Sequence, residues 1–207
     1  LSIIRDHVET DITVRQMITL GNATKALSED HMLMMQLSDI NGLYGEPLSP
    51  GGLLYAPPRN LFEGASVFLP VSIPEFPVTW KQVYTLSELL FRNRNLHLVH
   101  PRFAILNGGA KEGMARRVSR ELIKFGFDVV EVANVPNRKQ IESSLILQTN
   151  LDLDPAVSAY FTELLGFQSS DFSEAWQQDL AGRDTGDIAI ILGKDFAFKH
   201  FQDLIPL

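Results

Sequence analysis

Three basic residues recur at intervals of four in the C-terminal half of the chain: Arg116, Arg120 and Lys124. On a helix, residues four apart lie on one face, so the spacing predicts a basic stripe that can hold carboxylates or phosphates. A solvated helix face has the same pattern, and exposed ion pairs contribute only about 0.2 to 1 kcal/mol. Both interpretations stay open. The same spacing also allows Arg117 to pair with Glu121.

A glycine-containing turn precedes these residues. Asn107, Gly108 and Gly109 lie between a predicted strand and a predicted helix, and Gly113 follows at the helix start. Exposed amides and the helix dipole at such a place can bind an anion. The alternative is a tight turn in which Gly113 lets the helix pack closely on the sheet. The spacing fits neither G-x-G-x-x-G nor the P-loop, which favours the turn and predicts no nucleotide cofactor.

Polar donors follow the second predicted strand: Asn134, Asn137 and Arg138. Their amide and guanidinium groups are suited to sugar recognition, but asparagines are equally common in turns. With the glycine turn and the basic stripe they complete a candidate ligand-binding set. That set is Asn107, Gly108, Gly109, Arg116, Arg120, Lys124, Asn134 and Arg138.

No pattern of residues indicates catalysis or metal binding. The histidines have neither the H-x-x-x-H nor the H-E-x-x-H spacing of a zinc site, and no serine lies in a G-x-S-x-G elbow. The absence of cysteine excludes disulfides, thiolate metal sites and cysteine catalysis. We therefore expect a non-enzymatic fragment with no catalytic residue, no metal and no cofactor.

The balance of charge limits the partners. Eighteen basic and 25 acidic residues give a net charge of −7, which disfavours nucleic acid and anionic lipid. Any anionic ligand must therefore bind to a local patch. The composition, 45% hydrophobic, is typical of a soluble globular protein. No apolar run approaches the roughly 20 residues needed to span a bilayer, so we expect no membrane insertion by this fragment.

The elements that must position the candidate residues follow a regular order after residue 100. Strands are predicted at residues 102–106, 127–132, 145–148 and 187–192, and helices at 111–125 and 155–166. The order β-α-β-β-α-β matches a split β-α-β sandwich, in which two helices cover one face of a four-stranded sheet. Residues 169–183 form an insertion that is partly helical around 175–180. The sequence thus predicts an α/β (α+β) fold.

The first 98 residues are predicted as a smaller mixed α/β segment. Helices are expected over 10–27 and 79–96, strands over 31–40 and 66–72, and a long Gly/Pro-rich loop over 41–64. We place the domain boundary between residues 98 and 99, which gives domains 1–98 and 99–207. Because the chain starts at Leu1 and shows no signal-peptide pattern, we expect a piece of a longer protein.

Two stretches of the C-terminal half carry a family resemblance. They are FAILNGGAKEGMARRVSRELIKFGFDVVEVANVP, which begins at Phe103, and DIAIILGKDF, which begins at Asp187. Together they resemble the LytR C-terminal domain, whose pattern runs from a strand ending in Leu-Asn-Gly to a closing Asp-strand-Leu-Gly-x-Asp. Where that family commonly has Thr-x-Ile at the third strand, this chain has Ser144-Leu145-Ile146.

The N-terminal half resembles the last third of a LytR-CpsA-Psr domain, in which a segment like VETDIT, residues 8–13, leads a helix. The resemblance implies a parent protein that is anchored by a transmembrane helix outside this chain and faces the outside of the cell membrane. Such proteins transfer glycopolymers from a polyprenyl diphosphate carrier to the cell wall. The family's arginine-rich and aspartate motifs precede this point, so we expect the fragment to lack the transferase centre.

The two resemblances together predict a non-catalytic, extracytoplasmic module. Its expected partners are a cell-wall glycan, an anionic wall polymer or an envelope protein. The alternative is an accessory or regulatory segment that completes a LytR-CpsA-Psr phosphotransferase and has no ligand of its own.

Overall fold

The computed structural model describes residues 12–25, 52–71, 80–136 and 140–205 and divides the chain into two units, Leu1–Leu33 and Met34–Leu207. The strand expected over 31–40 and the loop residues 41–51 lie outside the described residues. None of the helices in the described ranges is long and apolar enough to cross a membrane. The domain boundary expected between residues 98 and 99 stays a prediction.

The first unit contains the helix α2 (Val14–Thr24), within the range expected for it. The helix begins at a capping box. The Thr13 hydroxyl accepts the Gln16 N–H at 3.3 Å, and the Gln16 side chain accepts the Thr13 N–H at 2.8 Å. Ile18 and Leu20 of this helix are more than half exposed.

The described part of the second unit begins with a short hairpin. β1 (Leu54–Tyr55) pairs antiparallel with β2 (Leu69–Pro70), and the 3-10 helix η2 (Arg59–Phe62) lies between them. The described end of the expected Gly/Pro loop therefore contains regular structure. Of the edge strand expected over 66–72, the structure shows Leu69–Pro70, and the Val71 N–H that follows donates to the Leu53 carbonyl at 2.8 Å.

The helix expected over residues 79–96 is broken into α3 (Lys81–Phe91) and α4 (Arg94–Leu98). The Arg92 and Asn93 N–H groups both donate to the Glu88 carbonyl oxygen. Such a widened turn interrupts the regular hydrogen-bond ladder. The chain then changes direction before it enters the sheet.

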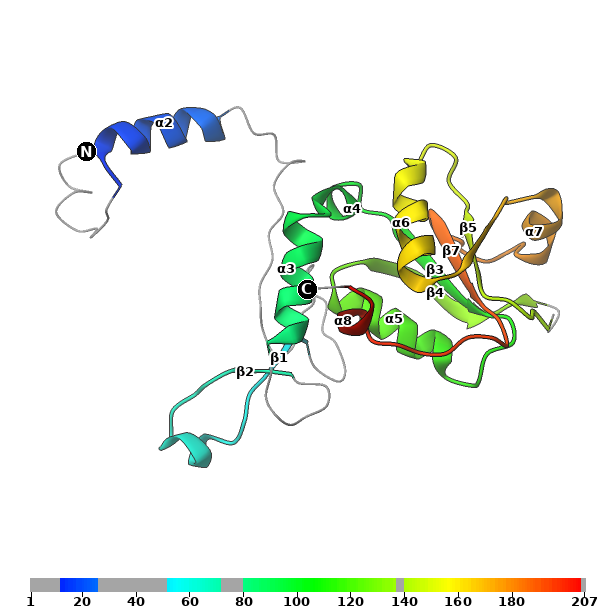
Figure 1. Ribbon diagram of the computed structural model, residues 1–207, viewed down its shortest axis with the longest axis horizontal. Helices are drawn as coiled ribbons and strands as arrows, with labels where there is room; N and C mark the ends of the chain where they lie inside the picture. The colour runs from blue at the N-terminus through cyan, green and yellow to red at the C-terminus, as the bar shows by residue number, and fades with distance from the viewer. Residues whose placement is uncertain (1–11, 26–51, 72–79, 137–139, 206–207) are drawn as a thin grey trace. The chain divides into compact units, whose positions relative to one another are not determined.

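The C-terminal part of the second unit is built on a five-stranded sheet (Figure 1). Its strands are β3 (Arg102–Asn107), β4 (Asp128–Asn134), β5 (Leu145–Gln148), β6 (Gln168–Ser170) and β7 (Ile188–Leu192). They lie in the order β4-β3-β7-β5-β6. β3 is parallel to β4 and β7, whereas β5 is antiparallel to β7 and parallel to β6. The α/β class is confirmed.

Two details differ from the predicted split sandwich. The sheet has a fifth strand, β6, and each β-α-β unit pairs its own two strands directly, so neither unit is split. The sequence does not predict β6, because Gln168, Ser169 and Ser170 are all polar and show no alternation of apolar and polar residues. β7 lies in the centre and is buried along its whole length, as its continuous apolar sequence predicts.

Helices α5 (Met114–Lys124) and α6 (Pro155–Leu165) cover one face of the sheet, as predicted. The Phe103 ring of β3 contacts Phe161 of α6 at a centroid distance of 4.8 Å. It also contacts Phe127, which directly precedes β4, at 5.7 Å. Leu122 of α5 is fully buried, which confirms the predicted orientation of that helix.

The inserted segment covers the opposite face. Ala104 and Leu106 point away from Phe103 because side chains alternate along a strand, and they belong to a second buried cluster. Trp176 and Phe172 pack against that cluster. Trp176 lies in α7 (Glu174–Asp179), the short helix expected in this insertion. The sheet is therefore covered on both faces.

The last described element, α8 (Phe201–Leu204), contacts α3. Lys81 of α3 forms an ion pair with Asp203 of α8 at 3.0 Å. Helix α3 thus packs on the part of the chain that follows residue 100.

Candidate functional site

The turn at residues 107–109 is closed by its own hydrogen bonds. Asn107 Oδ1 accepts the Gly109 N–H, and Asn107 Nδ2 donates to the Ala110 carbonyl, each at 3.1 Å. The Gly108 N–H donates to the Leu192 carbonyl at 2.8 Å. Both glycine amides are therefore used inside the protein, and an anion at this turn would have to displace these bonds.

The two glycines are required by close packing. A Cβ atom at Gly108 would lie 2.6 Å from Ile141 Cδ1, and one at Gly109 would lie 2.6 Å from the Ile141 carbonyl oxygen. This geometry fits the tight-turn interpretation. Gly113 does not allow close packing as expected, because nothing lies within 4 Å of a Cβ placed there. It adopts a φ of +81° before α5, a conformation that suits glycine.

The basic stripe on α5 is shorter than its spacing predicts. Arg116 and Arg120 are exposed, and their side chains form no hydrogen bond or ion pair with any residue that the structure describes. Lys124 is only 13% exposed. Its ammonium group donates to Gln82 Oε1 at 3.0 Å and to Glu121 Oε1 at 3.3 Å. Lys124 therefore joins α5 to α3, and two arginines remain as the exposed pair.

Arg117 and Glu121 do not form the ion pair that their spacing allows. The Arg117 guanidinium lies 4.0 Å from the centroid of the Phe198 ring, a cation–π contact. Glu121 is 8% exposed; its Oε1 lies 3.2 Å from His200 Nδ1, and its Oε2 accepts the Phe201 N–H at 3.4 Å. Glu121 thus fixes the C-terminal segment to α5.

The predicted polar donors are only partly brought together. Asn134 is exposed at the end of β4, where it is the register partner of Asn107. These two side chains lie at the same edge of the sheet, whereas Arg116 and Arg120 lie on α5. Asn137 and Arg138 lie outside the described residues.

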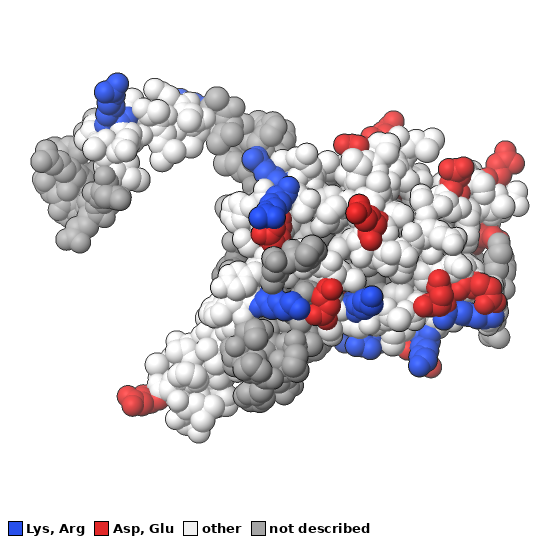
Figure 2. Space-filling view, in the orientation of Figure 1, with Lys and Arg blue, Asp and Glu red and all other residues white. Residues whose placement is uncertain are grey.

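The visible surface shows no broad field of one sign (Figure 2). In the lower right of this view basic and acidic side chains lie beside one another, and the charged side chains along the upper right edge are acidic. Within the described ranges, no three His, Asp or Glu side chains gather as a metal site would require. The described surface therefore offers an anionic ligand local basic side chains rather than a broad positive field.

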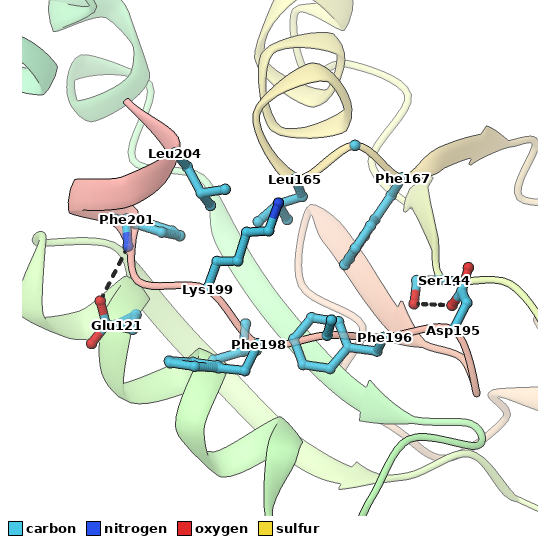
Figure 3. A pocket seen from close by; sticks show the side chains of 13 residues that line it. Glu121, Ser144, Leu165, Phe167, Asp195, Phe196, Phe198, Lys199, Phe201 and Leu204 are labelled. Carbon is cyan, nitrogen blue, oxygen red and sulfur yellow. Dashed lines mark hydrogen bonds between the residues drawn. The ribbon is translucent and has the colours of Figure 1, made fainter. Parts of the chain in front are cut away.

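A pocket of about 200 Å³ lies between α5, the end of α6 and residues 193–201 (Figure 3). We call residues 193–201, which follow β7, the C-terminal strap. Phe167, Phe196 and Phe198 form an aromatic wall and are all half-buried. The rings of Phe167 and Phe196 meet edge to face, with centroids 5.9 Å apart. Leu165 and Leu204 add aliphatic surface.

A hydrogen-bonded cluster closes one end of this pocket. Ser144 donates to Asp195 Oδ1 through both its hydroxyl and its N–H, each at 2.7 Å. The Gly193 N–H donates to Ser144 Oγ at 3.0 Å. Ser144 is almost fully buried. The hydroxyl at position 144 therefore fixes the start of the strap to the start of β5, and serine supplies it in place of threonine.

Sequence reasoning did not select the residues of the pocket. Ser144 and Asp195 appear in it only as motif positions, and no spacing rule connects residues that lie 51 apart. One signal was present in the strap itself. The run DFAFKHF, residues 195–201, repeats aromatic residues at short intervals after a buried strand, which indicates a segment that packs back onto the domain.

His97 is a buried titratable residue outside the pocket. It is 1% exposed, and neither of its ring nitrogens has a hydrogen-bond partner among the described residues. Its ring stacks on Phe127 with a centroid distance of 4.6 Å. Burial, with a smaller contribution from the nearby His100, lowers the pKa of His97 from 6.5 to about 4. The imidazole is therefore neutral at physiological pH.

Comparison with known proteins gives one family. Residues 101–196 match the model of the LytR_C family, described as the LytR cell envelope-related transcriptional attenuator. No curated protein and no solved structure was found to match the chain. The family match covers none of the residues before 101, so the LytR-CpsA-Psr-like part stays a prediction. Residues 101–196 are thus a LytR_C match, which indicates a cell-envelope-related accessory domain.

Proposed function

We propose that this chain is a non-catalytic cell-envelope module that binds a cell-wall glycan or an anionic wall polymer. It acts on the outer side of the membrane as part of a longer, membrane-anchored protein that resembles wall glycopolymer transferases. The observation that carries the proposal is the exposed pair Arg116 and Arg120 on the family-matched domain. Their side chains have no acidic partner within the described part of the chain.

Binding through this pair must be local and weak. Residues 101–207 contain 11 basic and 15 acidic residues, so no long-range field draws an anionic polymer to the domain. Exposed charges are screened beyond about 8 Å at physiological ionic strength. Wall polymers repeat the same carboxylate or phosphate many times, so insoluble wall presents a high concentration of equivalent sites to this weak contact.

The test is retention of the full chain on insoluble cell wall as salt is raised. Wild type is expected to bind at low salt and to elute progressively, and Arg116→Glu/Arg120→Glu is expected to lose most of the low-salt retention. Arg15→Glu/Arg59→Glu makes the same change in net charge at two exposed residues outside 101–196 and should retain binding. Equal retention of the two double variants would contradict a role for the α5 pair.

The alternative is a module that contacts an envelope protein, for example the transferase domain that it completes. One observation favours it. Trp80, Tyr84 and Phe91 recur at spacings of four and seven at the start of and along α3, and they are 50%, 59% and 81% exposed. Large exposed apolar residues of this kind mark protein contacts. A chain that ignores the wall but binds such a partner through these rings would support the alternative.

A further inference from the structure

The pocket beside the C-terminal strap has the size of a site for one small group. Its volume of about 200 Å³ lies below the roughly 300 to 1,000 Å³ of clefts that hold drug-sized ligands. It is bounded by secondary structure on two sides, by Val118 and Glu121 of α5 and by Leu165 of α6. One ring of a larger molecule therefore fits, with the rest of the molecule outside.

The aromatic wall favours a flat face with C–H groups. The Phe167, Phe196 and Phe198 rings remain half-exposed although each could be buried further by a ligand. One face of the Phe198 ring is already taken by the Arg117 guanidinium at 4.0 Å, which fixes that ring. A preformed wall of this kind binds a sugar ring through its apolar face, and rigid aromatic side chains lose little entropy in doing so.

The polar groups of the pocket favour an uncharged ligand. Asp195 Oδ1 is occupied by Ser144, but Asp195 Oδ2 receives no hydrogen bond from any residue in the described ranges. The Lys199 ammonium, which extends towards Leu165 in Figure 3, is likewise unpaired there. A ligand thus finds one free acceptor and one free donor. A phosphate would face the carboxylates of both Glu121 and Asp195 against the single Lys199 ammonium, and like charges repel.

We propose that this pocket binds one neutral N-acetylated sugar residue of a wall glycan. A ring hydroxyl donates to Asp195 Oδ2, the acetamido carbonyl accepts from Lys199, and the acetamido methyl lies against Leu165 and Leu204. The proposal rests on the proposed function only for the source of the sugar. It assigns recognition of the neutral glycan to the pocket and leaves the anionic groups of the wall to Arg116 and Arg120.

The test is titration of the ¹⁵N-labelled full chain with the β-1,4-linked trisaccharide of N-acetylglucosamine at high salt, where the arginine pair is screened. Saturable shifts are expected at the strap amides of Phe196, Phe198 and Lys199. The β-1,4-linked trisaccharide of glucose has the same ring without the acetamido group, and inorganic phosphate has the wrong charge. Both should leave the strap amides unshifted at the same concentrations.

Variants locate the binding. Phe196→Ala is expected to lower the affinity for the N-acetylglucosamine trisaccharide about tenfold, which corresponds to about 1.4 kcal/mol of binding free energy. Phe68→Ala, at a half-exposed phenylalanine outside the pocket, should not change the affinity. If Phe196→Ala fails to fold, Lys199→Met, at an exposed position, should produce a loss of similar size. No saturable binding by wild type, or binding that a folded Phe196→Ala or Lys199→Met variant keeps, overturns the proposal.

The two proposals fail in different ways. Trisaccharide binding at the strap without wall retention supports the pocket and contradicts the proposed function. Wall retention that depends on Arg116 and Arg120, without trisaccharide binding, supports the proposed function and overturns the pocket.

Discussion

Protonation of His97 should destabilise the folded chain at mildly acidic pH. Its pKa is lowered from 6.5 to about 4 by burial and by His100, so the unfolded chain takes up the proton first as the pH falls. Stability is therefore complete above about pH 6.5 and is lost progressively down to about pH 4. A tenfold difference in proton affinity corresponds to about 1.4 kcal/mol, so the loss is about 2 kcal/mol at pH 5 and about 3 kcal/mol at pH 4.

The assay is urea unfolding of wild type and His97→Phe between about pH 7.5 and pH 4. Phenylalanine keeps a ring to stack on Phe127 and removes the two nitrogens that have no partner among the described residues. The variant should gain about 2 to 3 kcal/mol relative to wild type as the pH falls, while Leu122→Ala should stay at a constant difference. A difference between wild type and His97→Phe that does not change with pH would refute the reasoning.

Three substitutions test the packing around the site by equilibrium unfolding. Leu122→Ala should cost about 2 to 5 kcal/mol, because the side chain is fully buried against the sheet; an unchanged melt would mean that α5 presents another face. Ser144→Ala should cost about 1 to 3 kcal/mol, since Asp195 Oδ1 loses the hydroxyl donor and keeps only the Ser144 N–H, and the Gly193 N–H loses its acceptor; Ser144→Thr should restore most of it. Gly109→Ala should cost about 1 to 3 kcal/mol through the clash with the Ile141 carbonyl, and a neutral effect would contradict the close approach.

The C-terminal fold could be predicted because its local signals agree with its tertiary structure. The apolar positions of α5 recur at helical spacing, Gly126 at φ +88° ends that helix, and Asp154 caps the next one. β6 could not be predicted, because its polar residues form a strand only through pairing with β5. The break between α3 and α4 could not be predicted either. It depends on two N–H groups that share the Glu88 carbonyl, and the residue types at these positions do not predict that hydrogen bonding.

The candidate site was harder to predict, because exposure and partners depend on contacts that are distant in sequence. Lys124 has the correct spacing for the stripe but is buried by α3, whose Gln82 lies 42 residues earlier. Glu121 has the correct spacing for Arg117 but is bound by the strap about 80 residues later. Helical periodicity decides which residues share a face. It does not decide which part of the chain covers that face.

The pocket is a consequence of where β7 lies in the sheet. β7 lies between β3 and β5, so the chain that follows it cannot add another strand beside it. The strap instead crosses the face of the sheet that α5 and α6 cover. Side-chain hydrogen bonds fix it at two points, at Asp195 through Ser144 and at Phe201 through Glu121. The residues between these points are held in place with their aromatic rings half-exposed. Because folding already orders these aromatic side chains, a ligand that binds to them causes little further loss of conformational entropy. This favours the binding of a ligand as small as one sugar residue.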